Sequence, residues 1–280
     1  MKKAMIVAVS RLIKLGANTT KVLSYPFHWL LPNKRFTLPE RAAPLLKGGT
    51  PSRIPRIIWQ TNFTDRVTLP VYLNYLFNRL MAPRFEYRFM ITEARREFIA
   101  EHYPEILPHY ERLQIGAAQA DLWRLLVLLK SGGVYLDIDA HQIWPLSCVL
   151  GTEREELYVT TRRGDLSNYF IASAPGNSHM KAVIDQIISN ITGEVVTGVF
   201  DTTGPGVFNK VLDQAKVPTV SYRHAVHQGS FTNEHFQYID KAEGKWTRQQ
   251  HTTAVVSDVP PPPPSTASRD SSSHDQASHR

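Results

Sequence analysis

The stretch Gly132-Gly133-Val134-Tyr135-Leu136-Asp137-Ile138-Asp139-Ala140 is the segment around which the chain is organised. Its β-branched, aromatic and aliphatic residues from Val134 to Ile138 are typical of a buried strand. The two glycines in front are suited to end a helix, because glycine adopts the left-handed C-terminal cap at little steric cost. Asp137 and Asp139 are two residues apart, so on a strand they would project from one face. Two such carboxylates repel each other unless a cation lies beside them, which favours a site for Mg²⁺ or Mn²⁺.

The segment from Gly116 to Lys130 predicts a helix that leads into this strand. Residues 122–129 are apolar except for Arg124, and a helix that is apolar on all sides is buried. Asp121 and Arg124 are three residues apart and therefore share one face of the helix. Charges on a buried helix must pair with each other or bind something polar. Two interpretations stay open: an internal ion pair, and contacts to the hydroxyl groups of a ligand.

The order of these motifs resembles a known family. Ala120-Asp121-Leu122-Trp123-Arg124, followed at the same spacing by Gly-Gly and V-Y-L-D-x-D, is similar to the DXD block of the family 32 glycosyltransferases. That group includes yeast initiating α-1,6-mannosyltransferases and bacterial capsule and lipopolysaccharide enzymes. The same block recurs in the glucosylating domains of the large clostridial cytotoxins. A bare D-x-D motif is uninformative, but the composite pattern is specific, and the resemblance extends from residue 54 to about residue 210.

The resemblance implies a metal-dependent, retaining glycosyltransferase, a hexosyltransferase that acts in the biosynthesis of surface polysaccharides. Its donor would be a UDP- or GDP-linked sugar, and its acceptor a glycan or a lipid-linked glycan. Asp139, together with Asp137, would hold Mn²⁺ or Mg²⁺, which stabilises the charge that develops on the leaving nucleoside diphosphate. Asp121 and Arg124 would bind the hydroxyl groups of the donor sugar.

Three further contacts to the donor are implied by the resemblance. Trp59 occupies the place where the related cytotoxins stack a tryptophan on the base, and the alternative is a core tryptophan. Asn168 lies in a strand that the family places near the donor sugar, and the alternative is a turn-forming asparagine. Trp246 belongs to a C-terminal segment of the kind that family members fold back over the metal.

The rest of the chain alternates strands with helices. We expect strands at 54–61, 85–91, 157–161 and 168–176, and helices at 69–81, 93–102, 178–191 and 207–212. This rhythm indicates an α/β domain with a mostly parallel sheet, and the resemblance implies that it is of the GT-A type, Rossmann-like. Ligands of such sheets bind beyond the carboxyl ends of the strands, where Asp137 and Asp139 would lie.

Charge is unevenly distributed along the chain. Residues 1–56 contain eleven Lys and Arg against a single acid, Glu40, whereas the remainder has 21 basic and 24 acidic residues. A basic arm on a slightly acidic body argues against a nucleic-acid partner. We therefore expect three regions: a basic amphipathic arm and connector (1–53), a GT-A domain (54–257) and a Pro/Ser-rich tail (258–280) that is disordered.

The first 24 residues predict a basic amphipathic helix, followed by a proline-broken aromatic connector over 25–32. Such a helix can lie in an anionic membrane surface, and the alternative is that it packs on its own domain. No run of about 18 apolar residues is present, as a membrane-spanning helix would require. The single cysteine, Cys148, fits a reducing compartment. Together these features predict a cytoplasmic protein, peripheral on the inner face of the membrane.

Two alternatives to a glycosyltransferase are weighed against it. A phosphohydrolase of the haloacid dehalogenase type also places D-x-D after an apolar strand, with the first Asp as nucleophile. That family has Thr or Val two residues after the second Asp, where this chain has His141. A non-catalytic membrane-associated scaffold, built on the basic arm and the proline-rich tail, would leave Asp121, Arg124 and the Asp pair without a role.

Overall fold

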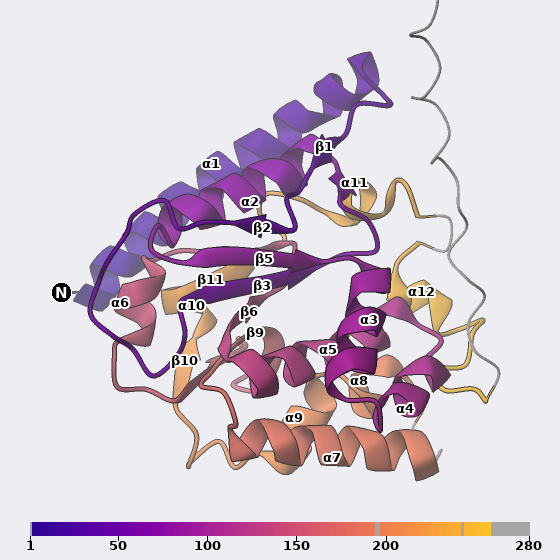
Figure 1. Ribbon diagram of the computed structural model, residues 1–280. Coiled ribbons are helices and arrows are strands. Elements are labelled where there is room, and N and C mark those ends of the chain that lie inside the picture. Colours follow the sequence, from indigo (N-terminus) through magenta and orange to yellow (C-terminus); the bar gives the residue numbers. More distant parts are fainter. Residues whose placement is uncertain (1, 194–196, 242–243, 259–280) are drawn as a thin grey trace, which may run out of the picture.

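The computed structural model describes residues 2–193, 197–241 and 244–258 of the chain, except for the side chains of residues 2 and 3 (Figure 1). The strands are β1 (Phe36–Thr37), β2 (Arg41–Ala42), β3 (Ile57–Thr61), β4 (Arg66–Val67), β5 (Glu86–Met90), β6 (Gly133–Leu136), β7 (Ala140–Gln142), β8 (Glu156–Thr160), β9 (Leu166–Ser173), β10 (Thr219–Ser221) and β11 (Val226–Gln228). The helices are α1 (Lys2–Leu30), α2 (Leu69–Met81), α3 (Thr92–His102), α4 (Leu107–Arg112), α5 (Gly116–Ser131), α6 (Leu146–Leu150), α7 (Ser178–Gly193), α8 (Val199–Thr202), α9 (Pro205–Val211), α10 (Tyr222–Ala225), α11 (Glu234–Tyr238) and α12 (Trp246–Gln249).

A seven-stranded sheet in the order β10-β8-β9-β6-β3-β5-β2 forms the centre of the fold. The pairings β3–β5, β3–β6 and β10–β8 are parallel, and β9 and β2 run against their neighbours. Five of the seven strands therefore point in one direction. The predicted α/β class with a mostly parallel sheet is confirmed.

Helices cover both faces of this sheet (Figure 1). On one face, α5 and α7 pack over a cluster that includes Trp59, Tyr135 and Ile171 from the strands. On the other face, α2 packs over a cluster that includes Ile58 and Val134. Since α5 lies against the sheet and beneath α7, it is buried along nearly its whole length, as its apolar sequence predicts.

The junction between α5 and β6 requires glycine. Gly132 has a φ of 63°, and a Cβ there would lie 2.8 Å from ring atoms of both Pro55 and Pro175. Gly133 has a φ of 110°, and its Cβ would lie 2.8 Å from the carbonyl oxygen of Ile57. Both positions combine a left-handed backbone with a close approach, which only glycine accepts without strain. The predicted end of the helix at these glycines is confirmed.

The strand after this junction is shorter than predicted. β6 ends at Leu136, and Asp137 to Asp139 form a turn in which the Ala140 amide donates to the Asp137 carbonyl at 3.0 Å. The two carboxylates are therefore not held on one face of a strand, as we expected from their spacing. The chain leaves the sheet here because the carbonyl groups beyond Leu136 bind side-chain amides from β3 and α2, as described below.

The other predicted elements match the structure within a few residues. Helix α2 does not bury the side on which most of its leucines lie. The side that carries Leu73, Leu76 and Leu80 is partly open, with Leu80 68% exposed. The buried side instead carries Asn74 and Asn78. Hydrophobicity alone predicts the wrong buried face for this helix, because its asparagines face the candidate site and form hydrogen bonds there.

Residues 1–53 are not a separate unit. β2 pairs with β5 at the edge of the main sheet, β1 pairs with β4, and α1 packs on α2 and α10. Residues 1–53 therefore pack against the domain that we expect from residue 54 onward. The tail is expected at 258–280, and all of it after Asp258 lies outside the described residues.

Helix α1 continues through Pro26 to Leu30, so the proline-broken connector expected at 25–32 is largely helical. The end of the helix is held on the domain by rings: Tyr25 lies 4.6 Å from Phe236 between centroids, and His28 lies 5.7 Å from it. None of the helices in the described ranges could span a lipid bilayer.

Candidate active site

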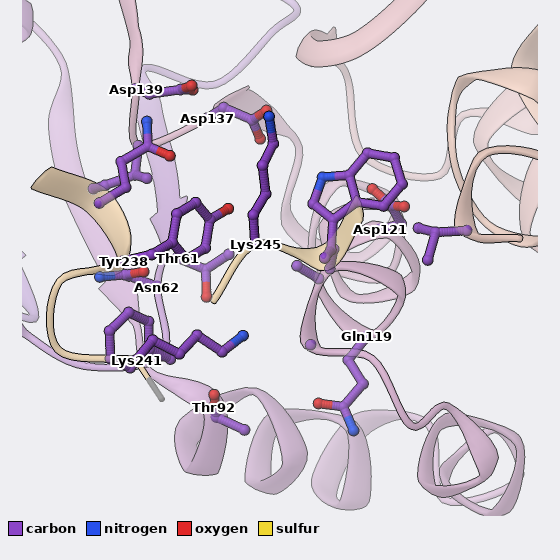
Figure 2. A pocket seen from close by; sticks show the side chains of 18 of the residues that line it. Thr61, Asn62, Thr92, Gln119, Asp121, Asp137, Asp139, Tyr238, Lys241 and Lys245 are labelled. Atoms are coloured by element: carbon purple, nitrogen blue, oxygen red, sulfur yellow. The ribbon is translucent and has the colours of Figure 1, made fainter. Parts of the chain in front are cut away.

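A cavity of about 2810 Å³ opens where the parallel strands β3, β5 and β6 end. Thr61 ends β3, Thr92 follows β5, and Asp137 and Asp139 follow β6, and all four line the cavity (Figure 2). This is the edge at which sheets of this kind bind ligands. Pockets for one small ligand measure roughly 300–1,000 Å³, so the cavity has room for two substrates.

Helix α5 contributes two buried charges to the cavity wall. Asp121 and Arg124 are 6% and 5% exposed, and an Arg124 guanidinium nitrogen lies 3.0 Å from Asp121 Oδ1. A second nitrogen of Arg124 donates to the carbonyl of Asn168 at 2.7 Å and lies 3.4 Å from Asp137 Oδ1. Arg124 thus joins α5 to the D-x-D turn and to β9. The ion pair expected from the sequence is present, and both of its residues line the cavity. Contacts to the hydroxyl groups of a ligand stay a prediction.

Both oxygens of Asp121 accept hydrogen bonds. The side-chain amide of Asn168 donates to Oδ1 at 2.9 Å, and the Thr203 hydroxyl donates to Oδ2 at 3.0 Å. Burial raises the pKa of Asp121 to about 7, while the charge of Arg124 acts in the opposite direction. A carboxylate with such a pKa can change its protonation state near neutral pH.

Side-chain amides hold the D-x-D turn by its backbone. Gln60 of β3 donates to the carbonyls of Leu136 and Asp137 at 3.2 and 3.1 Å. Asn74 of α2 donates to the carbonyls of Ile138 and Ala140 at 2.9 and 3.0 Å, and Asn78 donates to that of Ala140 at 2.9 Å. A carbonyl outside the sheet must find another donor when it is buried. These three amides therefore fix the direction in which the two carboxylates leave the turn.

The two carboxylates converge on one donor. The Gln228 amide nitrogen lies 3.2 Å from Asp137 Oδ2 and 3.0 Å from Asp139 Oδ1. The Tyr135 hydroxyl donates to the other oxygen of Asp137 at 2.7 Å. Burial, and after it the charge of Asp137, raises the pKa of Asp139 to about 6. A cation beside the two carboxylates would lower that pKa.

The donor set fits Mg²⁺ or Mn²⁺. These ions bind through one or two carboxylates and complete their shell with water and substrate phosphates. In the described part of the chain, no cluster of three or more His, Cys, Asp or Glu residues is suited to a metal. An ion beside Asp137 and Asp139 would have only these two carboxylates from the described chain, so its remaining ligands would be water and the diphosphate of a substrate.

The structure places Trp59 in the core and not at the cavity wall. Its side chain is 1% exposed, its indole nitrogen donates to the Gly132 carbonyl at 2.9 Å, and its ring packs edge-on against Trp123. Trp59 is the sheet partner of Tyr135, and both face α5. No face of the indole is open to a base, so the base-stacking expectation for Trp59 is replaced by its alternative, a core tryptophan.

The other two expected donor contacts lie at the cavity. Asn168 is 7% exposed near the start of β9 and lines the cavity beside Asp121. It is a strand residue and not a turn former. Trp246 begins α12, is half-buried and lines the same cavity. A segment near the C-terminal end of the described chain thus folds back over the site, as the resemblance implies.

Several site residues escaped the sequence-based prediction. Gln228 and Tyr238 come from the segment beyond residue 215, whose pattern is uninformative. Burial, and then the charges of Asp139 and Asp137, raise the pKa of Tyr238. Asn74 and Asn78 carried a usable signal: two asparagines four residues apart share one face of a helix that is otherwise apolar.

Comparisons with known proteins find relatives that share the DXD segment. Residues 70–156 match the family described as "Glycosyltransferase sugar-binding region containing DXD motif". Inositol phosphoceramide mannosyltransferase 3 of Schizosaccharomyces pombe is 35% identical over 89 residues, which cover 31% of this chain and 24% of that protein. The initiation-specific alpha-1,6-mannosyltransferase of the same yeast is 24% identical over 196 residues, covering 57% of this chain and 48% of that protein. The resemblance stated from the sequence is confirmed.

The chain matches only part of these relatives, between 24% and 48% of the length of the two named above. Among solved structures, one described as "PaToxG Glycosyltransferase" has a TM-score of 0.48 at 18% identity, over 77% of this chain and 79% of that chain.

Proposed function

We propose that residues 70–156, which match the family of DXD-containing glycosyltransferase sugar-binding regions, form the central part of the donor site of a retaining hexosyltransferase. The enzyme transfers a sugar from a nucleoside diphosphate to a glycan or a lipid-linked glycan. The observation that carries this proposal is the Arg124 link. One guanidinium joins a buried carboxylate on α5 to the D-x-D turn at the carboxyl edge of a parallel sheet.

The acidic and the basic residues of the site would have different roles in binding the donor. Asp137 and Asp139 would hold Mn²⁺ or Mg²⁺, which when bound stabilises the negative charge of the leaving nucleoside diphosphate. Gln228, which spans the two carboxylates, would turn away or offer its carbonyl oxygen when the ion is present. Lys241 and Lys245 also line the cavity (Figure 2), and their ammonium groups suit the phosphates of the same donor.

Asp121 and Arg124 bind the sugar. Asp121 accepts from Asn168 and Thr203, so its position is set before the ligand arrives. A carboxylate has about four lone-pair sites, and the sugar hydroxyls would take those that remain. Holding the ring in one orientation presents one face of the anomeric carbon to the acceptor.

The names of the relatives suggest the donor and acceptor. Several are mannosyltransferases, and three carry an inositol phosphoceramide in their names. A mannose donor and a membrane-resident acceptor, as in capsule or lipopolysaccharide synthesis, are therefore part of the proposal. The basic arm and the single cysteine support a cytoplasmic enzyme, peripheral on the inner face of the membrane. Neither the phosphohydrolase nor the scaffold alternative is favoured by the comparisons.

A panel of UDP- and GDP-linked hexoses, with products followed by mass spectrometry, tests the proposal. We expect hydrolysis or transfer with one donor, and a loss of roughly 10²–10³ in turnover for Asp139→Ala because charge stabilisation is removed. Asp185→Ala is the matched control, since Asp185 is an exposed aspartate on α7 that pairs only with Lys181 in the described structure. Full activity of Asp139→Ala, or full activity in excess chelator, would contradict the metal-dependent reaction.

A further inference from the structure

Helix α1 has two unlike faces. The face that packs on the domain is formed by small or polar side chains at helical spacing, Ser10, Ala17, Ser24 and His28, together with Ile6. It is held by specific bonds. Ser10 Oγ lies 2.8 Å from His227 Nε2, Lys21 donates to the Gly229 carbonyl at 3.1 Å, and His28 accepts from the Leu69 amide at 3.1 Å.

The opposite face is apolar and open. Its side chains are between 50% and 70% exposed and recur at intervals of seven and eleven residues: Met5, Leu12, Leu15, Val22, Leu23 and Leu30. Trp29, seven residues after Val22, is 80% exposed. Of the fifteen large apolar side chains that are exposed in the described chain, nine lie between Met5 and Leu31. Monomeric soluble proteins rarely gather so many on one surface unless it binds something.

The charged residues beside the open face indicate which kind of partner it binds. Helix α1 contains no Asp or Glu, and Arg11 and Lys14 lie exposed along one flank of the open face. An apolar stripe beside cations fits an anionic lipid surface, which offers acyl chains and negative head groups together. The helix is 29 residues long, lies along the outer edge of the fold and has α2 between it and the sheet (Figure 1). It can therefore rest lengthwise on a flat surface.

The end of this face meets the cavity. Trp29 and Leu30 end the helix, and Asn33 and Arg35 immediately after them line the cavity. Arg35 is anchored there by a 2.7 Å hydrogen bond to Asp240. We propose that the open face of α1, from Met5 to Leu30, docks the protein on an anionic lipid surface, with the cavity at the end of α1. The use of this docking to reach a lipid-linked acceptor rests on the proposed function, whereas the docking itself is independent of it.

Vesicle binding by the full chain tests the docking. We expect binding to vesicles with about 30% anionic phosphatidylglycerol, weaker binding to phosphatidylcholine alone, and a decrease as salt shortens the Debye length from about 10 Å to about 3 Å. Leu15→Glu with Val22→Glu should weaken binding at least about tenfold, because both side chains leave the acyl region. Ala182→Glu with Ser189→Glu is the matched control: it adds the same charge, at the same spacing, to exposed positions of α7.

Three results would overturn the docking. The first is that the unchanged protein does not bind anionic vesicles, and the second is that both double variants lose binding equally. The third is that the protein forms a dimer in solution and only Leu15→Glu with Val22→Glu dissociates it, which would assign the face to a second copy. Hydrolysis of the nucleotide sugar in the absence of vesicles is measured separately. It should survive both double variants, and its complete absence would count against the proposed function and leave the vesicle result standing.

Discussion

Helices α1 and α5 both depart from the rule that apolar side chains lie inside, in opposite directions. Helix α5 buries Asp121 and Arg124 at 6% and 5% exposure, whereas α1 leaves Leu12 and Leu15 at 70% and 66% exposure. The buried charges of α5 have protein partners on several sides. The exposed side chains of α1 belong to an apolar surface that the described chain leaves open.

The difference teaches how to interpret a departure from burial rules. A buried charge is tolerated where other groups satisfy it, and the partners of Asp121 and Arg124 are the ones that orient the D-x-D turn. An exposed apolar face is tolerated where a lipid surface or a partner can cover it. The first departure therefore indicates a ligand site inside the fold, and the second indicates an outer surface.

The strongest test of this comparison removes the cation of α5. We expect Arg124→Met to lower the free energy of unfolding by about 3–5 kcal/mol, because buried Asp121 loses its counter-charge and must either stay ionised without it or take up a proton. Urea unfolding measures the change. Arg53→Met is the control, since Arg53 is 57% exposed in its ion pair with Glu155 and should cost no more than about 1 kcal/mol. Equal losses would show that the buried ion pair of α5 contributes no more to stability than an exposed ion pair does.

The packed face of α1 can be tested by overfilling it. Ala17 is 1% exposed, and Ala17→Leu should lower the free energy of unfolding by about 1–3 kcal/mol, because the added methylenes have no space. Thermal unfolding without lipid would detect the loss. An unchanged melting temperature would mean that α1 is not fixed on the domain in solution.

The pH dependence of stability separates the two helices further. The pKa of Asp121 is raised by burial to about 7 in the folded protein, from an ordinary value of 3.8. Between these values the folded state holds a proton that the unfolded state has lost. The contribution of Asp121 to stability is therefore complete below pH 3.8 and is lost as the pH rises through about 7.

We expect the free energy of unfolding of the unchanged protein, minus that of Asp121→Asn, to fall as the pH rises toward neutrality. The slope should be at most about 1.4 kcal/mol per pH unit, the value for one proton. Denaturant unfolding at a series of pH values gives this difference. A flat difference would mean that Asp121 is ionised throughout this range. Leu15→Gln on α1 changes no titrating group and provides the control.

The smallest expected effect concerns the open face of α1. Leu15→Gln should change the free energy of unfolding in lipid-free solution by less than about 0.5 kcal/mol, because Leu15 is already largely in water. Calorimetry of the unchanged and substituted proteins, side by side, measures this. A loss comparable to that of Ala17→Leu would show that the face is covered in solution.

Much of the fold and part of the site could be predicted from sequence. The apolar run of α5, the two glycines and the periodic helices are local patterns, so their structures follow from short-range chemistry. The core position of Trp59 could not be predicted, since it depends on the register of β3 against β6 and on which face α5 covers. The end of β6 before Asp137 was missed for a similar reason: Gln60 and Asn74, distant in sequence, take over the hydrogen bonding.

By itself, the sequence determined the α/β class, the pairing of a buried charged helix with a D-x-D segment, and the amphipathic character of the first helix. Tertiary structure alone decided which residues meet. It brought Gln228 between the two carboxylates, linked Asp121 to Thr203 and turned the small, polar face of α1 inward. The reason is physical: side-chain periodicity is a property of a few neighbouring residues, whereas a hydrogen bond between distant segments depends on how every layer of the sheet packs.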